Sequence, residues 1–237
     1  MTNHEIQERI LYEDNHLLVF NKQTGQIVQG DKTGDEPLSE TLKAFIKARD
    51  GKPGNVFLGV PHRLDRPVSG VALFAKTGKA LERLNEMFRK GEVYKTYWAV
   101  VKQRPTPDVA TLTHYLRRNE KQNKSYVTDK NHEGAKEARL QYTWLCSGEN
   151  YHLLEVLLFT GRHHQIRCQL AAVGSPIKGD LKYGAPRSNP DGSISLHARS
   201  ASFVHPVKKD KITLTAPVPH DPLWQWFDAQ ITANSTT

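Results

Sequence analysis

Short apolar runs separated by turn residues are the feature that most constrains the fold of this chain. The longest runs cover residues 71–75 and 153–159, and Glu155 interrupts the second. Apolar runs of this length, bounded by Gly, Pro, Asn or Asp, are typical of strands. A membrane helix needs about 20 apolar residues, so the sequence predicts a protein that does not span a membrane.

Strand patterns alternate with helical patterns along the chain. Apolar residues at helical spacing predict helices that begin near Ser39, Thr77, His163 and Pro222. Glycines 51, 91 and 174 are expected to end the first three of these helices. Strands are expected at residues 10–12, 17–20, 27–28, 56–60, 71–75, 93–101, 111–116, 125–128, 138–144, 152–159, 196–203 and 212–215. This order predicts the α+β class, with a mixed, largely antiparallel β-sheet and flanking helices.

Composition limits the setting and the number of domains. The two cysteines, Cys146 and Cys168, form no Cys-x-x-Cys pair, so a disulfide framework or a thiolate metal site is not expected. Acidic residues early in the chain do not fit a secretory signal or a transit peptide, and we expect a cytoplasmic location. No repeat divides the sequence. We expect one catalytic domain over residues 1–232 and a disordered polar tail at 233–237.

The charge is strongly basic and concentrated in two segments. The formal net charge is +8 and the sequence pI is about 9.4, a balance that favours a polyanionic partner. Residues 62–104 contain ten Lys and Arg against four Asp and Glu, and residues 160–187 contain five against one. These segments either form a phosphate-binding cleft together or are two solvated faces of a basic protein.

The loop at residues 62–70 places one carboxylate among cations. Asp65 lies between Arg63 and Arg66, and His62 precedes them. Pro67 and Gly70 restrict the shape of the loop, and predicted strands flank it. Loops held by a rigid scaffold often carry catalytic groups, although a structural ion pair at the surface is the alternative interpretation.

A second group of polar residues lies at residues 160–167, where a strand is predicted to turn into a helix. Arg162, His163 and His164 stand at the helix start, where the helix dipole disfavours cations. This placement indicates a nearby anion, either a carboxylate or a phosphate. Surface or capping histidines are the alternative. A metal site is disfavoured, because adjacent helical side chains point about 100° apart and the spacing offers no third ligand.

Together these motifs resemble the RluA-type family of RNA pseudouridine synthases, over most of the chain. The ordered signatures are HRLD at 62–65 with SG at 69–70, KTYWAV at 95–100, GRHHQIR at 161–167, GSPIKGD at 174–180 with YG at 183–184, LHA at 196–198 and FVHP at 203–206. The chain departs from the family at Val68, where relatives usually have Thr. Many relatives carry an N-terminal S4 RNA-binding domain, whereas here we expect a stand-alone catalytic domain.

The resemblance implies a pseudouridine synthase fold and an isomerase that converts uridine in ribosomal or transfer RNA to pseudouridine. It assigns Asp65 as the nucleophile, Tyr97 as the aromatic contact to the target base and Arg162 as the cation paired with Asp65. The reaction breaks the C1′–N1 bond and rejoins uracil through C5, which calls for a covalent intermediate on a carboxylate, at the sugar or at the base. The target nucleotide must also leave its stack. RNA contacts are expected from His62, Arg63, Arg66, Lys95, His164, Gln165 and Arg167.

No metal, cofactor or obligatory protein partner is expected. The chain lacks Walker and Rossmann glycine patterns, which argues against nucleotide hydrolysis and redox cofactors. Two rival functions use the same basic segments: a non-catalytic RNA-binding protein, and a ribonuclease that depends on His62, His163 or His164. Neither explains Asp65 within its motif.

Replacing the candidate nucleophile tests these alternatives. Asp65→Asn is expected to bind RNA and to form no pseudouridine, because an amide cannot replace the carboxylate as a nucleophile. Chemical mapping of pseudouridine in the product RNA measures the outcome. Activity within about tenfold of the parent would contradict covalent catalysis by Asp65.

Overall fold

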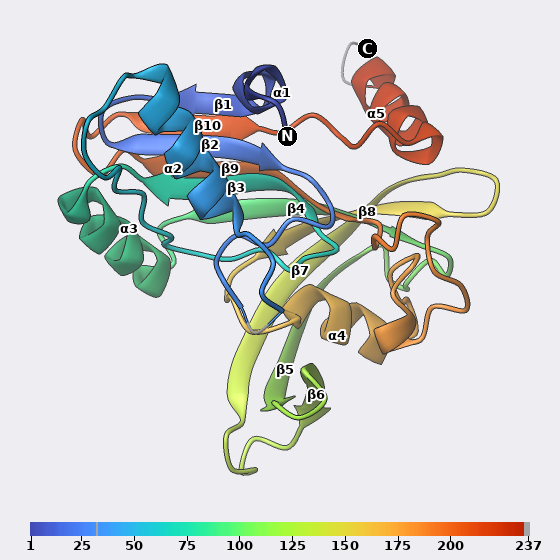
Figure 1. The fold of residues 1–237 in the computed structure, drawn as a ribbon. Coiled ribbons are helices and arrows are strands. Elements are labelled where there is room, and N and C mark those ends of the chain that lie inside the picture. The colour runs from blue at the N-terminus through green and yellow to red at the C-terminus, as the bar shows by residue number, and fades with distance from the viewer. Residues whose placement is uncertain (32, 235–237) are drawn as a thin grey trace. The chain divides into compact units, whose positions relative to one another are not determined.

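The computed structural model describes residues 1–31 and 33–234. The chain folds into two compact units, and Figure 1 labels their strands and α-helices. The first unit comprises Met1–Val93 and Arg199–Pro217, and the second comprises Tyr94–Ala198 and Val218–Thr237. Strand β9 (Leu196–Val204) contains one of the boundaries, so its first residues belong to the second unit and the rest to the first.

The first unit is a β-sheet with helices, in which β1–β2, β2–β3 and β9–β10 are antiparallel pairs. Its elements are α1 (Asn3–Glu8), β1 (Ile10–Glu13), β2 (Leu17–Lys22), α2 (Leu38–Arg49), β3 (Ser69–Ala75), α3 (Gly78–Lys90), the later part of β9, and β10 (Lys211–Thr215). The strand order is β1-β2-β3-β9, and β10 also pairs with β9. Antiparallel pairing sets Lys22 at the end of β2 opposite Gly70 at the start of β3. This register brings the end of β2 to the loop that contains Asp65.

Helix α3 packs on this sheet as its sequence pattern predicts. The Thr77 hydroxyl accepts the Ala80 N–H at the helix start, and Gly91 ends the helix in the left-handed conformation at φ 73°. Ala80 and Leu84 are fully buried. They belong to a hydrophobic core that the helix forms with strands of the sheet. Its other members include Leu17, Val19, Leu73, Val93 and Phe203.

The second unit has a longer antiparallel sheet. Its elements are β4 (Tyr94–Val101), β5 (Val109–Asn119), β6 (Lys124–Thr128), β7 (Lys136–Ser147), β8 (His152–Leu158), α4 (Gln165–Ala172), the 3₁₀ helix η1 (Leu181–Tyr183), the start of β9, and α5 (Pro222–Asn234). The strands follow the order β4-β8-β7-β5-β6, and each neighbouring pair is antiparallel. Helix α4 packs beside β5 and β6 (Figure 1).

Two hydrophobic clusters stabilise the second unit. Trp224 and Phe227 of α5 pack on Trp98, Val100 and Leu153 of the sheet. Beneath α4, a smaller cluster joins Cys168 and Tyr183 to strand residues Leu116 and Ala138. The second cluster fixes α4 and η1 against the β5–β7 side of the sheet.

The α+β class and the mostly antiparallel sheet with flanking helices are confirmed, but some local predictions are wrong. Residues 56–60 form no strand, and only Gly59 makes an isolated bridge to Ala75. A Cβ at Gly59 would lie 2.7 Å from a methyl carbon of Leu81, so the helix packs directly on this backbone. Residues 27–28 are also not a strand, because their carbonyl groups accept the N–H groups of Leu38 and Ser39 where α2 begins.

The helix ends also differ from the sequence predictions. Helix α2 begins at Leu38 after Pro37, without a side-chain cap from Ser39, and the short polar helix α1 was not expected. Helix α5 continues to Asn234, two residues into the segment predicted to be a tail. The remaining tail residues, 235–237, lie outside the described residues. Within residues 1–31 and 33–234, no helix has both the length and the apolar character to cross a membrane.

Two glycines in the second unit allow backbone strain and steric clash to be tested separately. Gly174 and Gly179 both have positive φ, 81° and 88°. A Cβ at Gly174 would meet nothing within 4 Å, whereas one at Gly179 would lie 2.7 Å from the Ser193 carbonyl oxygen. We expect Gly174→Ala to lower the free energy of unfolding by about 1–2 kcal/mol through strain alone. Gly179→Ala adds overpacking, so we expect a further loss of about 1–3 kcal/mol.

Urea unfolding of the two variants measures the difference. Equal losses in the two variants would contradict the close approach at Gly179.

Candidate functional site

Asp65 lies in a tight turn that the first unit holds at both ends. The Val68 N–H donates to the Asp65 carbonyl oxygen at 3.0 Å. Leu64 and Val68 are buried on either side of the turn, while the Asp65 side chain is half-buried. The Gly25 N–H also donates to the Arg66 carbonyl oxygen at 2.9 Å. The turn is therefore anchored through its apolar flanks and its main chain.

A buried lysine that belongs to none of the sequence signatures completes this anchoring. Lys22 has no exposed surface, and its Nζ lies 2.6 Å from the Val68 carbonyl oxygen and 3.2 Å from that of Arg66. The Asp65 carbonyl oxygen is 3.3 Å from the same Nζ. An ammonium group with three donors thus binds both ends of the turn that carries the candidate nucleophile.

The environment of Lys22 also perturbs its titration. Burial lowers the pKa of Lys22 to about 7, and the Asp65 carboxylate opposes this by raising it. Lysine is almost never fully buried without a partner, so a lysine that ends a buried strand is the sequence signal that could have identified this residue. The turn oxygens that it binds, however, lie more than forty positions away along the chain.

The other first-unit candidates have structural partners. The Leu73 N–H donates to His62 Nε2 at 2.9 Å, and the His62 ring stacks on Phe88 with centroids 4.9 Å apart. The Arg66 guanidinium binds the Asp35 carboxylate at 2.5 Å, and this contact lowers the pKa of Asp35. Arg63 is exposed. His62 therefore helps to hold β3 in place, whereas Arg63 and Arg66 are more accessible to solvent.

In the second unit, Lys95 and Tyr97 share one face of β4. Tyr97 is 7% exposed and lies opposite Val156, and Lys95 lies opposite Leu158 near the end of β8. Burial lowers the pKa of Lys95 to about 8. A Cβ at Gly161 would be 3.7 Å from Lys95 Nζ. The strand face that carries Tyr97 therefore lies beside the turn that begins the second motif.

Gln165 braces this turn from the inside. Its Oε1 accepts the Thr160 hydroxyl at 2.7 Å and the Arg162 N–H at 2.9 Å, and its Nε2 donates to the Arg139 carbonyl oxygen at 3.1 Å. His164, the residue before Gln165, has φ 52°, the left-handed conformation that turns the chain into α4. Gln165 and His164 are buried, so both help to build the turn.

The two arginines of this motif have different environments. Arg162 is exposed, and its Nε donates to the Glu137 carbonyl oxygen at 2.8 Å. Arg167 is 5% exposed and binds Asp180 through two nitrogen–oxygen contacts of 2.7 and 2.9 Å. A guanidinium held by a carboxylate in this fork geometry has a fixed direction. Arg167 is thus the positioned cation of the motif, and Arg162 is its solvent-facing cation.

Tyr183 links this ion pair to β6. Its ring lies under the Arg167 guanidinium, with 5.2 Å between the ring centroid and Cζ. Its hydroxyl accepts the Ser125 N–H at 2.8 Å, donates to the Ser125 carbonyl oxygen at 3.1 Å, and lies 3.0 Å from His164 Nδ1. Burial raises the pKa of the Tyr183 hydroxyl. Asp180 and Tyr183 lie in the GSPIKGD and YG signatures, but residue type and spacing alone indicate no role for them.

The candidates are divided between the units. Asp65, His62, Arg63 and Arg66 belong to the first unit, together with Lys22, and the remaining candidates belong to the second. Among residues 1–31 and 33–234, no three His, Cys, Asp or Glu side chains form a group that could hold a metal ion.

Comparisons with known proteins give matches over most of the chain. Residues 16–172 match the family model described as RNA pseudouridylate synthase, and this range contains Asp65, Tyr97 and both arginines of the second motif. The ribosomal large subunit pseudouridine synthase C of Haemophilus ducreyi is 32% identical over 222 residues, which cover 91% of this chain and 67% of that protein. An uncharacterized RNA pseudouridine synthase of Synechocystis is 33% identical over 214 residues, which cover 89% of this chain and 65% of that protein. The chain therefore spans about two thirds of the length of these curated relatives.

A solved structure is similar over nearly its whole length. The human RNA pseudouridylate synthase domain containing 4 matches with a TM-score of 0.78 and 25% sequence identity, and the match covers 95% of this chain and 94% of that one.

The buried Lys22 generates a prediction about stability and pH. Its pKa is lower in the folded chain than in the unfolded chain, so the unfolded chain binds more protons between about pH 7 and pH 10. The cost of burying the charged lysine therefore falls, and the free energy of unfolding rises, as pH rises through this window. We expect the difference in the free energy of unfolding, parent minus Lys22→Met, to rise by about 1 kcal/mol per pH unit across this window.

Urea unfolding at several pH values measures this difference. The exposed Lys79→Met variant of the same unit serves as the control, and its difference from the parent should not change with pH in this way. A pH-independent difference for Lys22→Met would show that Lys22 is not held in the buried contact.

Proposed function

This chain belongs to the RNA pseudouridylate synthase family and is an isomerase of uridine in RNA, and from this premise we propose that Asp65 is its nucleophile. The observation that carries the proposal is the anchored turn, in which Lys22 binds main-chain oxygens at both ends of a half-buried Asp65. The anchored turn fixes the position of the carboxylate, and covalent catalysis requires a nucleophile in a defined position.

The proposed reaction follows from the chemistry of the conversion. The Asp65 carboxylate bonds to the sugar or to the base, and the C1′–N1 bond breaks. The uracil then turns and C5 bonds to C1′. C5 loses its proton to a base or to water, N1 takes up a proton, and the carboxylate is released, so the product is an isomer of the substrate. The reaction is an isomerisation, so it needs no redox partner. We propose that it also needs no metal and no cofactor.

Tyr97 is proposed to contact the target base after it leaves the RNA stack. Its position supports this role, because β8 holds the backbone of Tyr97 on one side and the ring is almost fully buried. Unstacked bases in RNA are commonly held against aromatic side chains.

The cation of the reaction is proposed to come from the second motif. The family resemblance implies this role for Arg162, but the exposure of Arg162 and its contact with the Glu137 carbonyl group favour a role in binding phosphate. Arg167 is buried and oriented by Asp180, which favours it as the cation that acts with Asp65. Arg63 and Arg66 are proposed to bind phosphates with Arg162, while His62, Lys95, His164 and Gln165 are proposed to support the site around the RNA.

Ribosomal RNA is the first substrate that we propose to test. The Haemophilus relative is named as a ribosomal large subunit enzyme, and transfer RNA is the second candidate class. We further propose that residues 1–232 act as one catalytic domain, in the cytoplasm and without an obligatory protein partner. Pseudouridine mapping of total RNA from a deletion strain, restored with the parent or with Asp65→Asn, tests the function. Positions that disappear on deletion should return only with the parent. A ribonuclease would instead change RNA length.

The two arginines of the second motif can be separated by kinetics. We expect Arg162→Gln to raise KM and to reduce the salt dependence of binding, with kcat within about threefold of the parent. Arg167→Lys retains charge but loses the bidentate contact, so we expect kcat to fall at least tenfold.

Urea unfolding of Arg167→Lys must show a folded protein for the comparison to hold. A large loss of kcat in Arg162→Gln alone would return the catalytic role to Arg162.

A further inference from the structure

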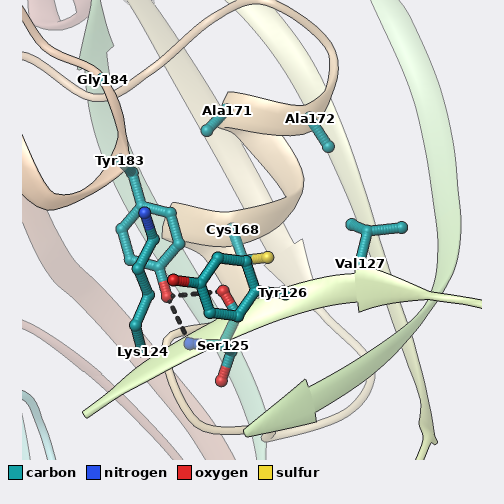
Figure 2. Close-up of a pocket in the computed structure, with 9 residues that line it drawn as sticks. All are labelled: Lys124, Ser125, Tyr126, Val127, Cys168, Ala171, Ala172, Tyr183 and Gly184. Atoms are coloured by element: carbon teal, nitrogen blue, oxygen red, sulfur yellow. Dashed lines mark hydrogen bonds between the residues drawn. The ribbon is translucent and has the colours of Figure 1, made fainter. Parts of the chain in front are cut away.

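A cavity of about 380 Å³ lies in the second unit between β6 and α4 (Figure 2). Strand residues Lys124–Val127 form one side. Cys168, Ala171 and Ala172 of α4 form another, and Tyr183 and Gly184 close the end. The proposed catalytic residues do not line this cavity.

The lining is mostly apolar and is open to solvent. Tyr126 and Val127 are 39% and 42% exposed, although both are large apolar side chains. Burial raises the pKa of the Cys168 thiol to about 11, so this group remains a neutral part of the wall. The Tyr183 hydroxyl is bonded to Ser125, as the dashed lines in Figure 2 show. An occupant of the cavity would therefore contact mainly aromatic and aliphatic side chains.

Cations surround this apolar surface. Lys124 Nζ lies 5.1 Å from the ring centroid of Tyr126 and 5.0 Å from that of Tyr183. Beside the cavity, Lys182 Nζ binds the Asn123 carbonyl oxygen at 3.1 Å, and Arg118 binds the Asn123 side chain at 3.2 Å. None of the nine residues that line the cavity is acidic. The combination of aromatic faces and positive charge complements a base with its phosphate better than a neutral protein segment.

We propose that this cavity binds an unpaired nucleobase of the substrate RNA, other than the target uridine, stacked on Tyr126 with its phosphate at Lys124. The proposal rests on the proposed function, because it assumes an RNA substrate. A base at this place recognises RNA next to a single-stranded or bulged nucleotide. Tyr183 contacts both the cavity and Arg167, so the bound base would orient the RNA close to the second motif.

Four variants of the full chain separate stacking from simple loss of stability. Tyr126→Ala removes the stacking face, and Ala172→Trp fills the cavity without removing a contact. Tyr126→Phe keeps the ring and loses only the hydroxyl contact to Gln122. Trp226→Ala is the matched control, because Trp226 is an exposed aromatic residue of the same unit on α5, outside the cavity.

The probe is a fluorescently labelled single-stranded RNA oligonucleotide, compared with the same sequence as a duplex. We expect Tyr126→Ala and Ala172→Trp to weaken single-strand binding at least fivefold, as the loss of one base stack does. Tyr126→Phe and Trp226→Ala should stay within about twofold of the parent. Duplex affinity should change little in all four. Lys124→Gln should reduce the log–log salt slope for the single strand by about 0.7, the value for one phosphate contact.

Photocrosslinking identifies the occupied place directly. Irradiation of the same oligonucleotide carrying 5-iodouridine should attach RNA to the peptide that contains Tyr126, and Ala172→Trp should suppress this product. Unchanged single-strand affinity in both Tyr126→Ala and Ala172→Trp, or crosslinks only elsewhere, would overturn the proposal. Circular dichroism and urea unfolding confirm that each variant is folded.

Pseudouridine formation is measured in parallel to separate the two proposals. An active parent whose RNA binding is insensitive to the cavity variants refutes the nucleobase site alone. A parent that crosslinks at Tyr126 but makes no pseudouridine refutes the proposed function and leaves the nucleobase site supported.

Discussion

The buried ion pair between Arg167 and Asp180 is the interaction on which the second unit's candidate residues depend. Both side chains are almost inaccessible, and two short contacts join them. Such a pair is costly to desolvate, and removing one partner typically costs about 3–5 kcal/mol. The pair ties α4 to the loop that carries η1, and Gly179 allows that loop to pass close to Ser193. Because Tyr183 lies on this loop, the pair fixes both the Arg167 guanidinium and the Tyr183 wall of the cavity between β6 and α4.

The first unit uses a buried cation for a similar purpose. Lys22 binds main-chain oxygens, so the turn around Asp65 is held through its backbone. Burial lowers the pKa of Lys22, and the charge of the Asp65 carboxylate opposes this shift. In both units a buried cation holds a segment that carries candidate site residues, while cations such as Arg63 and Arg162 are exposed.

Local sequence patterns predicted those elements whose stabilisation is local. Thr77 and Gly91 delimit α3 because capping and a left-handed residue act within a few positions of the helix ends. The hairpin of β9 and β10 also lies where its pattern predicts. Residues 56–60 were misassigned because an apolar run does not show whether a neighbouring strand is available. In this case a helix packs on Gly59, and only one bridge forms.

The sequence by itself determined the fold class, the family resemblance and the segments that carry the candidate chemistry, since residue types and short spacings record these properties. Only the tertiary structure decided which of those residues are buried and what they bind. Arg162 and Arg167 are five positions apart in one motif, yet one is exposed and the other is in a buried pair. Lys22 and Tyr183 gained their roles from partners more than forty positions away. Burial and long-range hydrogen bonds depend on how distant segments pack, and local spacing carries no record of that packing.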